Sequence, residues 1–394
     1  MLSRCSSALL ALSVLALAGC PDFRAGATEE TDAAALVDAG APDVIVPDER
    51  AKGLLQVPDL PMVNYRGVWA VSPNRVAIVG DETILDYVDG SWNVTVVGGS
   101  ELHGVWGDGE YMYAVGTFKQ TNTGVIMLKT RKDRTWVQLA TVPHGLRSVW
   151  GEGTFRMASG HDGVAYFGYE RSPFKEGVQN DPIAGAPNTL FAPIMSSVGG
   201  NSRSHVIAAA GPGGWFGYDG KNWKAFAENV DKTRSFRSVW GPPGDALDVI
   251  IGANYYGLWR FKGAKDANGK PIPTSILHEE RSDPLRANQF INGIWGASQR
   301  DFLAVGTGGR LIVFREKPDS DGVSILKTAA GARDLWSISG TNFSDVWIVG
   351  DDGVVLHGAV ESPAGAYRPL AMRSRSTTSA TRRRRSASRA CSHA

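Results

Sequence analysis

Side chains that could bind an anion recur at one position of a pattern that runs along most of the chain. In each copy, a short apolar segment ends in Val-Trp-Gly, Ile-Trp-Gly or a variant of these. Three residues before that tryptophan, or its equivalent, lie Arg66, His103, Arg147, Ser196, Arg237, Asn292 and Trp336. If these side chains gather in one place, their guanidinium and imidazole groups would form a basic cup for a carboxylate, an acidic or sulfated glycan, or an acidic peptide. The sequence leaves a second explanation open, because a strand that starts at a water-filled channel must be polar there in any case.

The repeated pattern predicts the strands that would position these residues. The copies are anchored at positions 69, 106, 150, 199, 240, 295 and 339, a mean spacing of about 45 residues over six steps. A second apolar segment, ending in Val-Gly or a similar pair, follows each anchor, and a third strand and a polar turn come after it. Four short strands in such a period are typical of propeller blades. We therefore predict an all-β, seven-bladed β-propeller of four-stranded blades, with the tryptophans packed between neighbouring blades.

Three details of this fold can be predicted less directly. The seventh copy needs a fourth strand, which residues 53–57 or residues 366–370 could supply, and we favour the N-terminal segment because joining both ends would lock the ring. Residues 170–188 and 262–289 resemble insertions, which usually form loops and often lie on a binding face. The stretches at 89–92 and 219–223 have the composition of hairpin turns.

The first twenty residues have the order of parts found in an export signal. Arg4 supplies a positive charge, an apolar run covers residues 9–18, and Leu-Ala-Gly then precedes Cys20. The run is too short to remain as a membrane-spanning helix. The segment resembles the lipobox of bacterial lipoproteins, which implies cleavage before Cys20 and lipidation of Cys20. Several acyl chains on one residue would anchor the protein stably to a membrane.

Composition supplies the remaining boundaries. Residues 1–19 would be the signal peptide, 20–52 the lipidated cysteine and a disordered tether, 53–370 the propeller, and 371–394 a disordered Arg/Ser-rich tail. Pro21 stands where a retention signal resembling that of enteric bacteria would have Asp, which favours the outer membrane, although Asp22 follows it. We expect a lipid-anchored protein of the cell envelope, periplasmic or surface-exposed. The tail could contact anionic lipid or polysaccharide, or it could stem from a shifted reading frame.

The propeller region offers little for catalysis or metal binding. Its net charge is mildly acidic, because the formal charge of +1 for the whole chain includes the seven arginines of the tail, and this argues against nucleic-acid binding. The three cysteines all lie outside it, and the histidines are scattered without the spacing of metal ligands. A sialidase-like hydrolase would use an arginine cluster, but the motifs of that class are absent. We expect no enzymatic activity, no cofactor and no metal.

The copies resemble the Val-Trp-Gly, Ala-Val-Gly and Gly-Thr-Ile-Leu repeats of β-propeller lipoproteins from soil-dwelling, social bacteria. They are more distantly similar to Asp-box propellers and to photosystem assembly-factor propellers, over about residues 60–360. The resemblance implies a fold rather than a ligand, since propellers host many functions. We expect a monomeric, non-catalytic binding or scaffolding module held at the membrane by Cys20, with an envelope protein as its partner. A polysaccharide-binding, lectin-like module and a sialidase-like glycoside hydrolase are the alternatives.

Overall fold

The computed structural model describes residues 53–169, 172, 175–176, 195–210, 214–220, 223–225, 235–242, 249–254, 257–265, 271–277, 289–298, 300–316 and 321–360. These residues form β-strands joined by turns, with short 3-10 turns at η1 (His161–Gly163) and η4 (Thr307–Gly309). None of the helical turns in this part of the chain is long and apolar enough to cross a membrane. The predictions for Cys20, the tether and the tail concern residues outside the described ranges.

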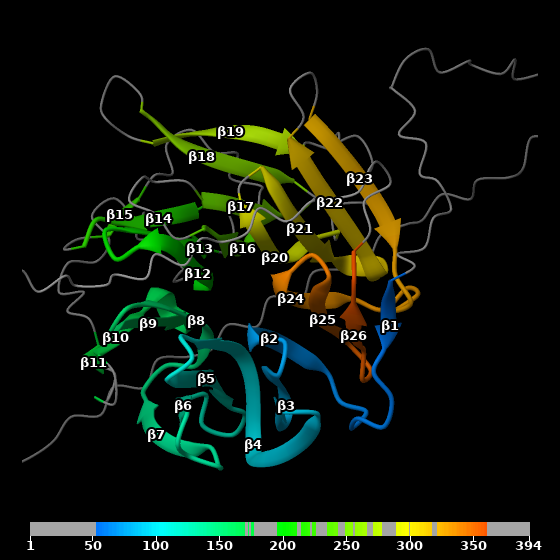
Figure 1. Ribbon diagram of the computed structural model, residues 1–394. Helices are drawn as coiled ribbons and strands as arrows, with labels where there is room; N and C mark the ends of the chain where they lie inside the picture. The colour runs from blue at the N-terminus through cyan, green and yellow to red at the C-terminus, as the bar shows by residue number, and fades with distance from the viewer. Residues whose placement is uncertain are drawn as a thin grey trace, which may run out of the picture. The chain divides into compact units, whose positions relative to one another are not determined.

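The strands form seven antiparallel blades (Figure 1). Blades 1 and 2 share a continuous sheet, because two of its strands are long enough to serve twice. The strand β3 (Arg75–Val88) supplies the second and third strands of blade 1, and β4 (Ser91–Gly107) supplies the outer strand of blade 1 and the inner strand of blade 2. Blade 1 starts with β2 (Tyr65–Ser72). Blade 2 continues with β5 (Tyr111–Phe118), β6 (Gly124–Thr130) and β7 (Val137–Val142).

The other five blades are separate four-stranded sheets. Blade 3 contains β8 (Leu146–Glu152), β9 (Phe155–Gly160), β10 (Ala165–Tyr169) and β11 (Lys175–Glu176). Blade 4 contains β12 (Met195–Ser202), β13 (His205–Ala210), β14 (Gly214–Tyr218) and β15 (Trp223–Ala225). Blade 5 contains β16 (Phe236–Trp240), β17 (Val249–Ala253), β18 (Leu258–Lys265) and β19 (Pro271–Leu277). Blade 6 contains β20 (Ile291–Ser298), β21 (Asp301–Gly306), β22 (Arg310–Glu316) and β23 (Asp321–Lys327). Blade 7 contains β24 (Leu335–Asn342), β25 (Asp345–Gly350), β26 (Val355–Gly358) and β1 (Leu54–Gln56).

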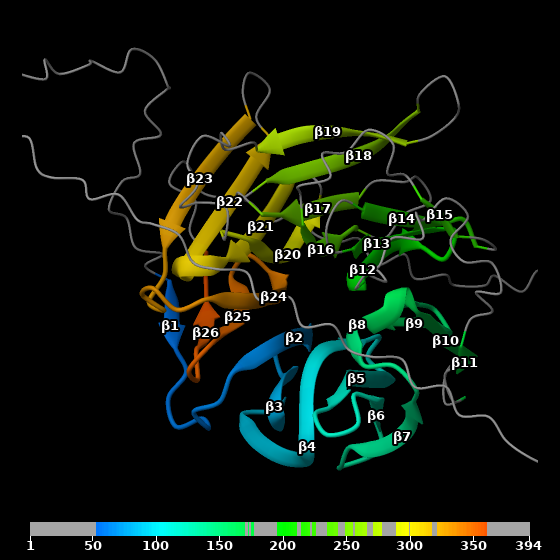
Figure 2. The ribbon, with the colours of Figure 1, turned by 180° about the vertical axis from the view of Figure 1, so that it is seen from behind.

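The inner strands of the blades form a closed ring. Each contacts the next in the order β2, β4, β8, β12, β16, β20 and β24, and β24 contacts β2 again. Figures 1 and 2 show β2, β8, β12, β16, β20 and β24 toward the middle and β7, β11, β15, β19 and β23 toward the periphery, while the long strand β4 runs from the periphery inward. The predicted seven-bladed β-propeller is therefore confirmed.

The last blade is completed by the N-terminal strand. β1 pairs antiparallel with β26, with Leu54 opposite Gly358 and Gln56 opposite Leu356. Leu54 is almost completely buried and belongs to the apolar cluster between blades 6 and 7. The prediction that the N-terminal segment closes the ring is confirmed, and the alternative segment, 366–370, lies outside the described residues.

The core lies between the faces of adjacent blades. Trp215 of blade 4 packs against Phe236 and Phe261 of blade 5, with ring centroids 4.6 and 5.0 Å apart. The repeated tryptophans act in the same way: Trp69 lies 6.0 Å from Trp106 of the next blade and donates a hydrogen bond to the Gly107 carbonyl at 2.8 Å. Their large apolar area and single donor suit this position, as predicted from the repeat.

One predicted insertion is wrong. Residues 262–289 include the end of β18 and the whole of β19, which are the third and fourth strands of blade 5. Part of the long connection after residue 240 is therefore regular blade structure, and residues 266–270 and 278–288 lie outside the described ranges. The prolines at 271 and 273 are accommodated because β19 is the outer strand of its blade, where a missing N–H is tolerated. In the other predicted insertion, 170–188, residues 175–176 form β11, and most of the rest lies outside the described ranges.

The predicted hairpin at residues 89–92 is confirmed. Val88 pairs with Ser91, and the two residues between them, Asp89 and Gly90, have φ angles of 47° and 90°. Positive φ at both central positions matches the twist of the flanking strands. At 219–223, Tyr218 pairs with Trp223 across a longer turn.

Candidate functional site

Each inner strand contains a β-bulge at the same place. In β2, Tyr65 pairs with Gly80 and Gly67 pairs with Val79, so Arg66 has no partner on β3. The same shift occurs in the other six inner strands, where the extra residues are His103, Arg147, Ser196, Arg237, Asn292 and Trp336. Side chains of a regular strand alternate between the two sheet faces, which here pack on neighbouring blades, whereas a bulge redirects its extra side chain. The bulges thus present the predicted ring residues to the centre of the propeller.

Each bulge lies between a buried anchor and a small residue. The preceding residues are fully buried: Tyr65, Leu102, Leu146, Met195, Phe236, Ile291 and Leu335. The following residues are all Gly or Ser: Gly67, Gly104, Ser148, Ser197, Ser238, Gly293 and Ser337. A Cβ on Gly67 would lie 2.9 Å from the His103 carbonyl oxygen of the next blade, so the inner strands approach too closely there for a larger side chain.

The serines at this position connect neighbouring blades. The backbone N–H of Val68 donates to Ser337 Oγ at 3.2 Å, and that of Val239 donates to Ser197 Oγ at 3.2 Å. Ser148 accepts from Val198 in the same way at 3.1 Å. These bonds hold the inner strands, and hence the bulges, in fixed positions relative to one another.

All seven ring residues line one central cavity of about 560 Å³. That volume lies in the range of small-ligand sites. Two positions further along the inner strands, the cavity is lined by an apolar collar of β-branched residues: Val68, Val105, Val149, Val198, Val239, Ile294 and Ile338. The repeat gives every inner strand the same register, so the collar lies roughly 7 Å deeper in the channel than the ring. The cavity therefore has a polar mouth above apolar walls.

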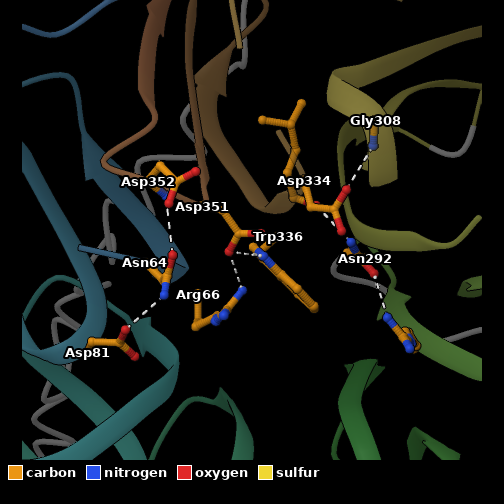
Figure 3. A network of polar contacts seen from close by, with 11 residues as sticks. Asn64, Arg66, Asp81, Asn292, Gly308, Asp334, Trp336, Asp351 and Asp352 are labelled. Atoms are coloured by element: carbon orange, nitrogen blue, oxygen red, sulfur yellow. Dashed lines mark hydrogen bonds and ion pairs between the residues drawn. The ribbon is translucent and has the colours of Figure 1, made fainter. Parts of the chain in front are cut away.

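Arg66 is neutralised by an acidic residue of blade 7. Its Nη1 donates to Asp351 Oδ1 at 2.7 Å, and Trp336 Nε1 donates to the same oxygen at 2.9 Å (Figure 3). The Arg66 guanidinium also lies over the Trp336 ring, 4.2 Å from its centroid. Two ring residues and one neighbouring carboxylate thus form a closed set of contacts.

His103 contributes no positive charge at neutral pH. Burial, together with the nearby charges of Arg147 and Arg66, lowers its pKa from 6.5 to about 3. Glu101 Oε2 lies 3.9 Å from His103 Nε2, which is a contact with a neutral ring rather than an ion pair. Nε2 is buried and has no hydrogen-bond partner among the described residues. The basic character expected of the ring therefore comes from its arginines.

Arg147 and Arg237 lack an ion pair with any described residue. Arg147 Nε donates to His161 Nε2 at 3.3 Å. Arg237 lies over the Phe290 ring, 3.3 Å from its centroid, and Nη1 donates to Asn292 Oδ1 at 3.5 Å. Burial lowers the pKa of both guanidinium groups, while the charge of Glu101 acts on Arg147, and that of Asp334 on Arg237, in the opposite direction. Arginine stays protonated despite such shifts, so two positive charges without a direct ion pair among the described residues face the cavity.

The charges and donors of this arrangement can bind an anion. Within the described ranges, no group of three or more His, Cys, Asp or Glu side chains is placed to hold a metal ion. His103, the imidazole of the ring, is neutral over the physiological range and so could not supply a proton there.

The repeat alignment brought together the seven ring residues but not the groups that hold them. Asp351, His161 and Phe290 escaped notice, although Asp351 and His161 directly follow the glycine that ends the second strand of their blades. Polar residues at that recurring position could have indicated side chains that contact the ring. That the ring is a binding site stays a prediction.

No protein-family model matches this sequence, and no curated protein matches it either. Solved structures similar to this chain include YCF48 bound to D1 peptide, with 13% identity and a TM-score of 0.55 over 78% of this chain and 96% of that one. YCF48 from Cyanidioschyzon merolae has 15% identity and a TM-score of 0.57, covering 79% of this chain and 100% of that one. The WD40 repeats of RRP9 have 11% identity and a TM-score of 0.59, covering 80% and 100%. At these identities the similarity concerns the fold: the described part of the chain is a β-propeller of the kind shared by YCF48 and the WD40 proteins.

Proposed function

We propose that this protein is a non-catalytic binding or scaffolding propeller of the bacterial cell envelope, and that it holds an envelope protein at the mouth of its channel. It would act as a monomer anchored by lipid on Cys20. The observation that carries the proposal is the seven bulges, which direct one side chain from every blade into a single cavity. Bulges tend to occur where a side chain must be re-aimed for function.

The anchoring half of the proposal is supported by the sequence. The leader with its lipobox-like end would place Cys20 at a membrane, and residues 21–52 are long enough to let the propeller reach partners near that surface. A partner in the same envelope follows from this location.

A protein partner suits the channel mouth better than a polysaccharide. Sugars bind well to exposed aromatic faces, but Arg66 covers one face of Trp336 and Arg237 covers one face of Phe290. Among the described residues, the cavity lining contains no tyrosine, which a sialidase-like hydrolase would use as its nucleophile. Both alternatives are outcomes of the test below.

The test is photo-crosslinking in living cells from a reactive amino acid placed at Ser196. We expect capture of an envelope protein, lost when Arg66, Arg147 and Arg237 are all changed to Ala while the melting temperature is preserved. A reactive residue at Gln138, exposed on the outer strand β7, is the matched control. Unaltered capture by the triple variant would place the binding surface elsewhere, and capture of glycan alone would favour the lectin. In parallel, Cys20→Ala should release the protein from the membrane fraction.

A further inference from the structure

The ring of seven bulge residues has two unequal halves. On blades 7, 1 and 2, Arg66 is paired with Asp351, and Glu101 lies beside the neutral His103. On blades 3 to 6, Arg147 and Arg237 have no carboxylate partner among the described residues, and the ring residue between them is Ser196. An anion entering the channel would therefore be attracted more strongly to the second half, because Asp351 neutralises Arg66 in the first.

Asp351 shows which donors this cavity offers to a carboxylate. One of its oxygens accepts both a guanidinium N–H and an indole N–H, at 2.7 and 2.9 Å. Charge-assisted bonds of this kind are the strong ones, and arginine is suited to carboxylates by the geometry of its planar fork. Arg147 and Arg237 provide the same group, and their acceptors among the described residues are neutral side chains rather than carboxylates.

The arginines are held in place for such a ligand. Arg237 stacks on Phe290, and the amide of Asn292 both accepts from Arg237 and donates to the Leu335 carbonyl at 2.9 Å. Contacts of this sort restrict a flexible side chain before a ligand arrives, which lowers the entropy cost of binding. Two like charges facing one cavity raise the free energy of the empty site, and an anion between them relieves it.

The apolar collar below the ring determines what the carboxylate is attached to. A ligand whose charged group meets Arg147 and Arg237 would extend toward β-branched side chains such as Val149, Val198 and Val239. Burying an aliphatic group there is favourable, whereas a sugar hydroxyl would lose its hydrogen bonds to water. A carboxylate on a short aliphatic group meets both requirements.

We propose that the half-ring of Arg147, Ser196, Arg237 and Asn292 binds an aliphatic carboxylate, and that this is the C-terminal carboxylate of a polypeptide ending in an apolar residue. The inference rests on the proposed function and specifies which part of the partner enters the channel. Arg66 is a positioning residue in this arrangement, because Asp351 neutralises its charge and accepts from its Nη1.

The experiment is fluorescence anisotropy with the full chain and a labelled peptide, Gly-Ser-Gly-Ala-Val, that has a free C-terminus. Its C-terminal amide should bind at least roughly tenfold more weakly, the loss expected for one charge-assisted contact. Arg147→Gln and Arg237→Gln should each weaken binding of the free acid by a similar factor, and Arg147→Lys should restore part of it. Arg300→Gln, which changes an exposed arginine on blade 6, is the control and should have no effect.

A gain-of-function variant keeps the proposal testable if the loss-of-function variants unfold. Asp351→Asn removes the carboxylate that occupies Arg66, so the free-acid peptide should bind several-fold more tightly. A decrease in affinity in a folded Asp351→Asn variant would contradict the charge argument.

Further probes distinguish the sources of the carboxylate. An amidated peptide with an internal Glu and free octanoate should both bind more weakly than the free-acid peptide; tighter binding of either would overturn the assignment to a chain end. Binding of a uronate oligosaccharide in place of the peptide, or no peptide binding at millimolar concentration, would overturn the proposal. If the peptide does not bind while partner capture from position 196 still depends on the arginines, the proposed function stands, and only the assignment to a C-terminal carboxylate is rejected.

Discussion

Residues at the same bulge position of different blades differ in charge. His103 and Arg147 occupy the same bulge position in adjacent blades, yet His103 is neutral and Arg147 is charged. The reason is that an imidazole can lose its proton when it is buried among positive charges, and a guanidinium does not. The arginines of the ring therefore act on His103 as well as on any ligand.

The neutral state of His103 should make the protein sensitive to acid. Its pKa falls from 6.5 to about 3 on folding, so below pH 6.5 the unfolded chain binds a proton that the folded chain does not. Stability is full above pH 6.5 and decreases toward pH 3, by at most about 1.4 kcal/mol per pH unit. His103→Gln should flatten this decrease in urea unfolding between pH 7 and pH 4. His205→Gln, on β13, is the control, and equal slopes for wild type and His103→Gln would contradict the assignment.

At the scale of the strand, a small residue lies opposite the anchor that precedes each bulge, and in five blades it is glycine. A Cβ on Gly350 would lie 2.3 Å from the Asp334 carbonyl oxygen, and one on Gly80 would lie 2.1 Å from that of Asn64. Blades 4 and 5 carry Ala210 and Ala253 at the equivalent place, so these two blades accommodate a methyl group there. The Val-Gly ending of the repeat thus reflects close approach of backbones beside the bulge.

Gly350→Ala should therefore destabilise the protein, by about 2 kcal/mol, as overpacking typically does. The matched control is Gly98→Ala, because no atom lies within 4 Å of a Cβ at that exposed position. Denaturant unfolding measures both. A Gly350→Ala variant as stable as the control would mean that blade 7 accommodates a methyl group as readily as blades 4 and 5.

The strands could be predicted from the sequence where the residues that indicate them lie close together in the chain. Tryptophan anchors and apolar segments lie within each strand, so their spacing predicted the blade number and the ring register. The bulge is a relation between two strands, and the pairing of Arg66 with Asp351 joins residues that are far apart in the sequence, so neither has a local signature. The strand β19 was missed because the anchors at 240 and 295 are further apart than the mean spacing, so the residues between them resembled an insertion.

At the scale of the molecule, the ring is closed by three residues of the N-terminal strand. β1 adds its pairing with β26 and the burial of Leu54, and it ties the first and last parts of the propeller together. Each blade of a closed ring packs on two others, so the unfolding of one blade removes two interfaces. Closure should therefore stabilise all blades at once.

Deleting residues 53–60 should lower the melting temperature of the whole propeller, in a single transition followed by circular dichroism. Deleting residues 366–370, the alternative closing segment, should leave it unchanged. An unaltered melting curve for the first deletion would show that the blades hold together without the closing strand.

The repeated bulge also separates the residues of the proposed binding site from those that build the fold. Each extra residue has no partner across its hairpin, while the anchors before it and the small residues after it build the ring of strands. Seven substitutions, one per blade, would replace every bulge side chain at the channel mouth without altering the apolar interfaces between blades. A combinatorial library confined to these seven codons would sample new binding specificities on an unchanged scaffold.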